Sequence, residues 1–178
     1  MPKARPIMGI GIVVVVVLLA GCGGSGDPTS TSASAGPEAQ RPAAVTLDRL
    51  RNLAEAIGHP VYWAGPRPGG YELTVDVNRN IFIRYLEGKV PAGSRRQTSL
   101  TVATYPYSNA YRTLESASRQ PGATADRTPD GGLVVSIAGS NDNVHIAYPS
   151  RDIQIEVYDP SPGRALALAT AGDIVALR

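Results

Sequence analysis

The chain has 178 residues, with 17 Lys and Arg against 15 Asp and Glu, and 43% of its residues are hydrophobic. A formal charge of +2 excludes the strongly basic surface with which proteins attract nucleic acid at long range. The single cysteine excludes a disulfide within the chain, so a folded domain must be held together by its hydrophobic core.

The first residues predict a secretory signal. Lys3 and Arg5 form a positive start, and an apolar run follows over residues 10–20. This run has the length of a signal h-region, about 7–15 residues, and falls short of the about 20 residues that span a membrane. Residues 19–22, Leu-Ala-Gly-Cys, end the run and resemble the lipobox of bacterial lipoproteins.

The lipobox resemblance implies both cleavage of the signal and a location in the cell. In bacterial lipoproteins a signal peptidase cuts before the cysteine, whose thiol then carries a diacylglycerol. Residues 1–21 are therefore expected to be removed, and Cys22 to anchor an exported protein to the outer face of the cell membrane. Lys3 and Arg5 leave with the signal, so the mature chain is formally neutral and no nucleic-acid partner is expected. The alternatives are an ordinary signal with an incidental cysteine, or an uncleaved apolar anchor.

A tether is predicted between the signal and the domain. Residues 23–44 contain Gly, Ser, Thr, Ala and Pro with scattered charge, and no aromatic residue, Leu, Ile or Val. Such a segment cannot bury enough apolar surface to offset its ordering entropy. We therefore expect the lipidated Cys22 and a flexible linker over residues 22–44, followed by one domain over residues 45–178.

The first predicted element of this domain is a helix over residues 46–58. Leu50 and Ile57 share its apolar face, Thr46 is suited to cap its start, and Gly58 is suited to the left-handed position after its end. A second helix is expected over 109–119 with Ser108 as its cap. A third is expected to begin at Ser161 and to end near residue 171.

Alternation of apolar and polar residues predicts the strands. They are expected over residues 61–64, 71–77, 81–86, 98–105, 133–138, 143–148 and 153–158, with a loop over 120–132 and a short strand or tail at 174–177. Consecutive hairpin-like strands indicate an α+β fold. We expect a mostly antiparallel sheet with about three helices packed on one side of it.

No catalytic or metal-binding motif emerges from the sequence. His59 ends a helix and His145 lies in a predicted strand, and both are interpreted as structural residues rather than as catalytic bases. The carboxylates of Glu72, Asp76 and Glu156 are interpreted as side chains on the solvent-exposed face of a sheet. Residues 141–143, Asn-Asp-Asn, suit a tight turn better than a calcium site. No catalytic residue, metal or cofactor is predicted.

Aromatic and arginine side chains offer the best candidates for binding. Tyr62, Trp63, Arg67, Phe82 and Arg84 lie within one stretch, and Tyr, Trp and Arg are the residue types that dominate binding hot spots. The same aromatic types also form the core of small sheets. Phe82 and Arg84 alternate with Ile81 and Ile83, so they are expected to face a partner or a covering helix.

Four blocks, 61–66, 70–74, 83–86 and 146–149, resemble exported proteins of high-GC actinobacteria that have no assigned activity. The resemblance implies a compartment and no catalytic residues. The sequence thus predicts a membrane-anchored, non-catalytic binding or interaction domain of the cell envelope, whose partner is an envelope protein or a small ligand. The alternatives are a small-ligand or substrate-binding lipoprotein with a pocket beside Trp63, Tyr62 and Arg67, or a hydrolase that uses carboxylates or histidines.

Overall fold

The structure of the protein is a computed structural model that describes residues 40–88, 90–94, 97–139 and 142–178. The predicted signal, Cys22 and the predicted tether up to residue 39 lie outside the described residues. Within them, no helix is both long enough and apolar enough to cross a membrane.

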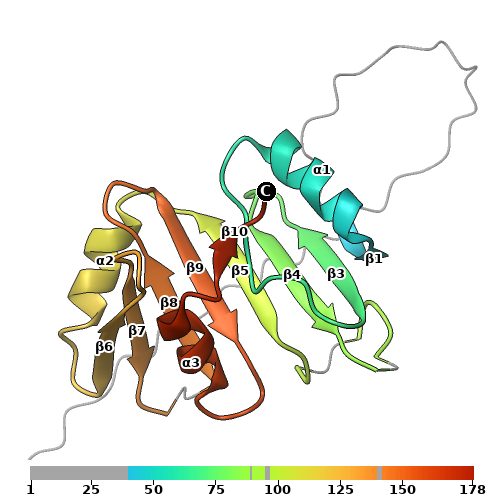
Figure 1. The fold of residues 1–178 in the computed structure, drawn as a ribbon. Coiled ribbons are helices and arrows are strands. Elements are labelled where there is room, and N and C mark those ends of the chain that lie inside the picture. Colours follow the sequence, from blue (N-terminus) through green and yellow to red (C-terminus); the bar gives the residue numbers. More distant parts are fainter. Residues whose placement is uncertain (1–39, 89, 95–96, 140–141) are drawn as a thin grey trace, which may run out of the picture. The chain divides into compact units, whose positions relative to one another are not determined.

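The described residues form three helices and ten strands (Figure 1). The helices are α1 (Leu47–Ile57), α2 (Ala110–Ala117) and α3 (Arg164–Ala171). The strands are β1 (Gln40–Val45), β2 (Tyr62–Trp63), β3 (Gly70–Val75), β4 (Ile81–Leu86), β5 (Thr101–Pro106), β6 (Ala123–Arg127), β7 (Leu133–Ile137), β8 (Asn143–Ala147), β9 (Ile153–Tyr158) and β10 (Val175–Ala176).

Eight of the described strands form one sheet in the order β1-β3-β4-β5-β9-β8-β7-β6, and every neighbouring pair is antiparallel. β2 and β10 form a separate antiparallel pair. The predicted α+β fold with a mostly antiparallel sheet and three helices is confirmed. Strand order adds what the sequence did not predict: β5 pairs with β9 rather than with the strand that follows it.

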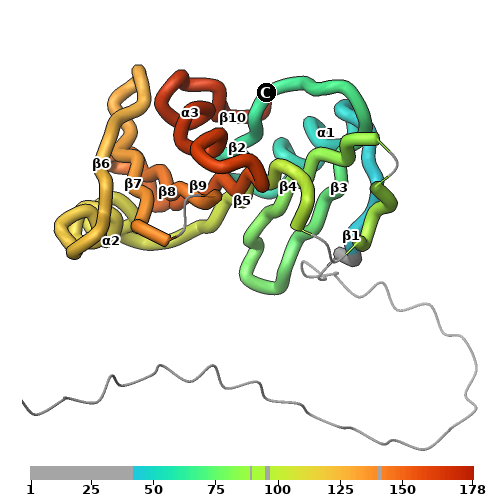
Figure 2. Tube along the Cα trace, turned by 90° about the horizontal axis from the view of Figure 1, so that it is seen from below, coloured from blue at the N-terminus to red at the C-terminus, as the bar shows by residue number. Residues whose placement is uncertain are grey.

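The helices cover both faces of the eight-stranded sheet. Leu50 of α1 and Ala165 of α3 belong to one hydrophobic core on the first face, whereas Leu114 of α2 belongs to a second cluster on the other face. Figure 2 shows α1 and α3 on one side of the strands and α2 on the other. The expectation that all helices pack on one side is therefore wrong. The reason lies in β7, which buries Val134 on the first face and Val135 on the second.

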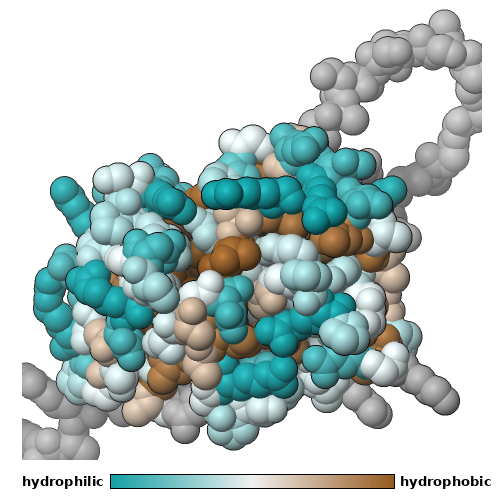
Figure 3. All heavy atoms as spheres, in the orientation of Figure 1, coloured by the Kyte–Doolittle hydropathy of each residue, from teal (hydrophilic) through white to brown (hydrophobic). Residues whose placement is uncertain are grey.

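The first face carries the main core. Alternate residues of the strands point into it: Tyr71, Leu73 and Val75 of β3, Ile81, Ile83 and Tyr85 of β4, Val102 of β5, Val144 and Ile146 of β8, and Ile153, Ile155 and Val157 of β9. Each fully buried aliphatic side chain contributes about 1.5–3 kcal/mol to folding. Seen from this side, the surface over the helices is mainly hydrophilic, and hydrophobic atoms show in the gaps between elements (Figure 3).

The ends of α1 are as predicted, whereas the starts of the other two helices are not. The Thr46 hydroxyl accepts a hydrogen bond from Arg49 N–H, and Gly58 takes the left-handed conformation. At α2 the N-cap is Asn109 rather than Ser108, and the backbone N–H of Asn109 donates to Asp152. At α3 the N-cap is Gly163, because residues 161–163 form a turn before the first helical hydrogen bond.

Two strands lie where the sequence predicted none. β6 (Ala123–Arg127) falls within the predicted loop 120–132, and β1 (Gln40–Val45) takes the last residues of the predicted tether. Both are edge strands of the sheet, held by backbone pairing on one side only. Edge strands need no alternating apolar pattern, and four of the five β6 side chains are exposed. The register irregularity in β1 spans Pro42, a residue found at edges and bulges.

Tyrosines buried against the first face predict a loss of stability in alkali. Burial and, to a smaller extent, the nearby Asp130 carboxylate raise the pKa of Tyr148 from an ordinary value of 10.0 to about 12. Burial also raises the pKa of Tyr85 well above that value. A raised pKa in the folded state means that folding favours the neutral phenol. Stability is therefore complete below about pH 10 and declines as the pH rises from there through about 12.

Urea unfolding at a series of pH values checks this expectation. The free energy of unfolding should fall above about pH 10, and the fall should be shallower in Tyr148→Phe, which has no phenol to ionise at that position. Equal slopes in both proteins would contradict the assignment of Tyr148.

Candidate functional site

The second face of the sheet is only partly covered. α2 packs on Leu133, Val135 and Ala147 at the β7 and β8 end, and no other described helix lies on this face. The same face of β3, β4, β5 and β9 is not covered by a described helix. On this face Glu72 of β3 lies opposite Arg84 of β4, and Glu156 of β9 lies opposite the small Ala103 of β5.

A groove of about 370 Å³ crosses this open face. Its form follows from residue size along three adjacent strands. β5 presents the small side chains of Thr101 and Ala103, while Phe82 of β4 and Tyr158 of β9 rise on either side. The described residues that line it are Phe82, Gln97, Thr101, Ala103, Tyr105, Asp142, Asn143, Glu156 and Tyr158.

Glu156 is the polar centre of the groove. Its Oε2 accepts a hydrogen bond from the Tyr105 hydroxyl at 2.5 Å, and its Oε1 accepts one from Asn143 Nδ2 at 2.5 Å. Burial, the hydrogen bond to Glu156 and the charge of Glu156 all raise the pKa of Tyr105. The phenol therefore stays neutral and keeps donating. Because a carboxylate has about four acceptor sites, Glu156 can accept further hydrogen bonds from a ligand.

Two aromatic rings form a corner at one end of the groove. The rings of Phe82 and Tyr105 lie 5.8 Å apart, centroid to centroid, at an interplanar angle of 87°. This edge-to-face contact fixes both rings relative to each other. At the opposite side, the Tyr158 hydroxyl donates to the Gln97 carbonyl oxygen at 2.7 Å, which joins β9 to the segment between β4 and β5. The walls of the groove are thus held by contacts made without a ligand.

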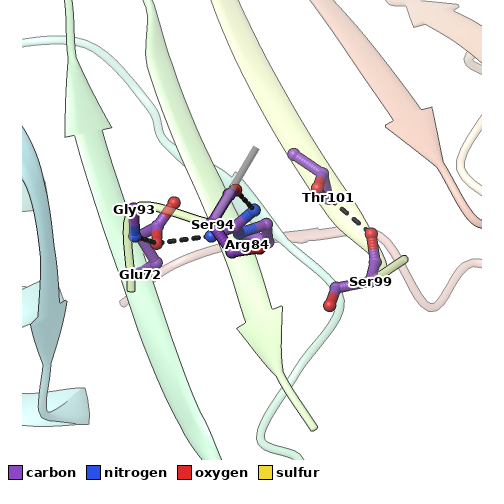
Figure 4. A network of polar contacts seen from close by, with 6 residues as sticks. All are labelled: Glu72, Arg84, Gly93, Ser94, Ser99 and Thr101. Carbon is purple, nitrogen blue, oxygen red and sulfur yellow. Dashed lines mark hydrogen bonds and ion pairs between the residues drawn. The ribbon is translucent and has the colours of Figure 1, made fainter. Parts of the chain in front are cut away.

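A buried ion pair lies beside the groove on the same face (Figure 4). Arg84 Nη2 lies 2.6 Å from Glu72 Oε2, and the two side chains are 12% and 8% exposed. Glu72 also accepts the backbone N–H of Gly93, and Arg84 donates to the Ser94 carbonyl oxygen. The pair therefore fastens the segment that follows β4 onto the sheet, next to Gln97 in the groove wall.

The structure separates the five predicted binding residues into two groups. Phe82 lines the groove and Arg84 lies beside it, on the open face. Tyr62 and Trp63 are 2% and 6% exposed in the main core, so a ligand would find little of either ring. Arg67 lies over the Tyr85 ring, with its Cζ 5.8 Å from the centroid, and its Nε donates to the Ala64 carbonyl oxygen. These contacts favour a role in packing for the three residues around Trp63.

The other polar candidates also take structural positions. Asp76 accepts hydrogen bonds from Asn78 N–H and from Asn80, and so holds the turn between β3 and β4. His145 contacts Gln154 on the open face, and His59 contacts the Pro60 carbonyl oxygen at the end of α1. The described residues contain no group of three or more His, Cys, Asp or Glu side chains placed to hold a metal ion.

Several groove residues were not singled out from the sequence as ligand contacts. Thr101, Ala103 and Tyr105 share the face of β5 opposite Val102, so alternation alone assigns them to the same face as Phe82. What alternation could not show is that β9 lies next to β5 and brings Tyr158 into the groove. The order of the strands in the sheet therefore determines which residues line the groove.

The fold and the groove together describe an α+β domain with a ligand-sized hollow on an open sheet face. Comparisons with protein-family models, with curated proteins and with solved structures found no match.

Proposed function

We propose that this protein is an exported lipoprotein whose domain binds a component of the cell envelope and has no catalytic role. Cys22 carries the lipid that holds the domain at the outer face of the cell membrane. The open-face groove is its binding site. The observation that carries this proposal is the preformed groove, which has small residues at its floor and fixed aromatic and polar walls.

The size of the groove favours a small ligand over a broad protein contact. Ligand sites in proteins have volumes of about 300–1,000 Å³ and combine apolar walls with a few placed polar groups. A groove of about 370 Å³ with Phe82, Tyr105 and Glu156 falls in this range. Of the binding functions that the sequence left open, a small-ligand-binding lipoprotein therefore has the stronger support.

Replacing Cys22 by alanine is expected to abolish lipid attachment and membrane retention. The wild-type protein should incorporate an alkyne-tagged palmitate in its host and should sediment with membranes, in a form that lacks residues 1–21. Cys22→Ala should incorporate no label. Mass spectrometry of the intact protein checks both statements. Label on Cys22→Ala, or a wild-type protein that keeps residues 1–21, would contradict the anchor.

Filling the groove is expected to abolish ligand retention. In Thr101→Phe the added ring should occupy the space between Phe82 and Tyr158. The full-length protein is purified from its host in a mild detergent, and small molecules released on denaturation are measured by mass spectrometry. A compound retained by the wild type should be at least about tenfold depleted in Thr101→Phe, which corresponds to about 1.4 kcal/mol of binding free energy.

Thr124→Phe provides the matched control for this experiment. Thr124 is an exposed residue of β6, so the same substitution there leaves the groove unchanged. It should retain the compound at the wild-type level. If both variants retain it equally, or if the wild type retains none under native extraction, the groove is not the binding site.

A further inference from the structure

We propose that the groove on the open sheet face binds a small alkylammonium cation, with Glu156 and Asp142 supplying the charge and Phe82 and Tyr105 the aromatic surface. This inference rests on the proposed function, in which the groove is the ligand site. It adds the chemical class of the ligand.

Charge is the first argument for a cation. The described lining of the groove contains two carboxylates, those of Glu156 and Asp142, and no lysine or arginine. On the same face, Arg84 is engaged by Glu72 at 2.6 Å. His145 lies opposite Glu156 in the β8–β9 register, and its ring contacts Gln154. The raised pKa of Tyr105 has the charges of Glu156 and Asp76 among its causes, which agrees with a negative potential here. An anionic ligand would meet repulsion in this environment, and a cationic ligand would meet attraction.

The aromatic corner is the second argument. Phe82 and Tyr105 stand nearly perpendicular, at 87°, so a group placed in the corner can meet π-systems from two directions. Cations bind the faces of aromatic rings within about 6 Å of the centroid, and sites built from several rings select alkylated ammonium groups. A carboxylate beside the rings completes such a site, and Glu156 is joined to Tyr105 by a 2.5 Å hydrogen bond.

Within the described part of the chain, Glu156 forms no ion pair. Its hydrogen-bond partners among the described residues, the Tyr105 hydroxyl and Asn143 Nδ2, are both neutral donors, so neither neutralises the carboxylate. By contrast, Glu72 on the same face has a direct arginine partner. The size of the groove, about 370 Å³, suits a small free ligand rather than a chain of several residues.

Choline and its uncharged isostere, in which a tert-butyl group replaces trimethylammonium, test this inference. The two probes have nearly the same shape and differ by one positive charge. Each is titrated into the full-length protein in non-ionic detergent, and amide chemical shifts are followed by NMR. Choline should shift residues of β4, β5 and β9 around the groove. It should bind at least about tenfold more tightly than the isostere.

Two variants with the same chemical change separate local charge from net charge. Glu156→Gln should weaken choline at least about tenfold and leave the uncharged isostere unchanged. Glu55→Gln removes the charge of an exposed residue on α1, on the other face of the sheet, and should leave both probes unchanged. Circular dichroism confirms that each variant is folded.

Each remaining outcome overturns the inference in a recognisable way. Equal binding of choline and the isostere in the groove would contradict the claim that the ligand is a cation, but it would still support the groove as a binding site. If neither probe shifts residues at the groove, the alkylammonium inference is also contradicted. The retention experiment with Thr101→Phe then tests the proposed function separately. Tighter binding of a peptide with trimethylated lysine than of choline would overturn the commitment to a small free ligand.

Discussion

Replacing Arg84 by methionine is expected to lower the free energy of unfolding by about 3–5 kcal/mol. The methionine keeps most of the apolar stem but removes the guanidinium that lies 2.6 Å from Glu72. The Glu72 carboxylate is 8% exposed, so it would remain buried without a charge partner. The segment after β4 would also lose the hydrogen bond from Arg84 to the Ser94 carbonyl oxygen. Because small domains have stabilities of about 5–15 kcal/mol, this change is a large fraction of the total.

Chemical denaturation of three variants and the wild type measures this effect. Arg119→Met breaks the pair with Glu115, whose side chains are 66% and 46% exposed, and should cost less than about 1 kcal/mol. The double variant Glu72→Gln, Arg84→Met buries no charge and should recover part of the loss. If Arg84→Met and Arg119→Met cost the same, the pair on the sheet does not behave as a buried one.

Replacing Gly69 by alanine is expected to destabilise the fold by about 2–4 kcal/mol, because two separate penalties combine. Gly69 has a φ of +101°, a conformation that residues with a Cβ rarely adopt. A Cβ added there would lie 2.3 Å from the carbonyl oxygen of Leu86, which is backbone and cannot rotate away. β3 and β4 pair at this point, through Gly70 and Leu86, so relief of the clash must open the hairpin.

Gly131→Ala isolates the clash from the backbone conformation. Gly131 has a φ of +89°, and a Cβ there would have no atom within 4 Å. It should therefore show only the conformational penalty, about 1–2 kcal/mol. Thermal unfolding of both variants provides the comparison. A Gly69→Ala protein that is no less stable than Gly131→Ala would show that the Leu86 carbonyl can move at little cost.

Local elements were predicted well because their causes are local. The Thr46 cap and Gly58 end fix α1, and alternation fixes β9 (Ile153–Tyr158) to the residue. Alternation also assigned Phe82 and Arg84 correctly to the face opposite Ile81 and Ile83. These features depend on residues within a few positions of one another, so a single sequence contains them.

The site was only half predicted because its remaining causes are distant in the chain. Tyr62 is buried in the main core, where its ring stacks on Tyr148, and β2 pairs with β10. Nothing near Trp63 in the sequence indicates that Tyr148 or Val175 will lie beside this strand. The groove depends on the pairing of β5 with β9, which sets Thr101 opposite Tyr158. Neither pairing follows from local pattern, and each changes which face of a strand is covered.

The pairing of β5 with β9 also has a kinetic consequence. On one side of this seam, β3, β4 and β5 are joined in chain order, and on the other β6, β7, β8 and β9 are joined likewise. Each set can form by closing short loops, whereas the seam closes a loop that contains the whole of α2 and three strands. Distant pairings of this kind slow folding because their entropy is lost before their contacts form. We therefore expect the two meanders to form early and the groove to form last, when the seam closes.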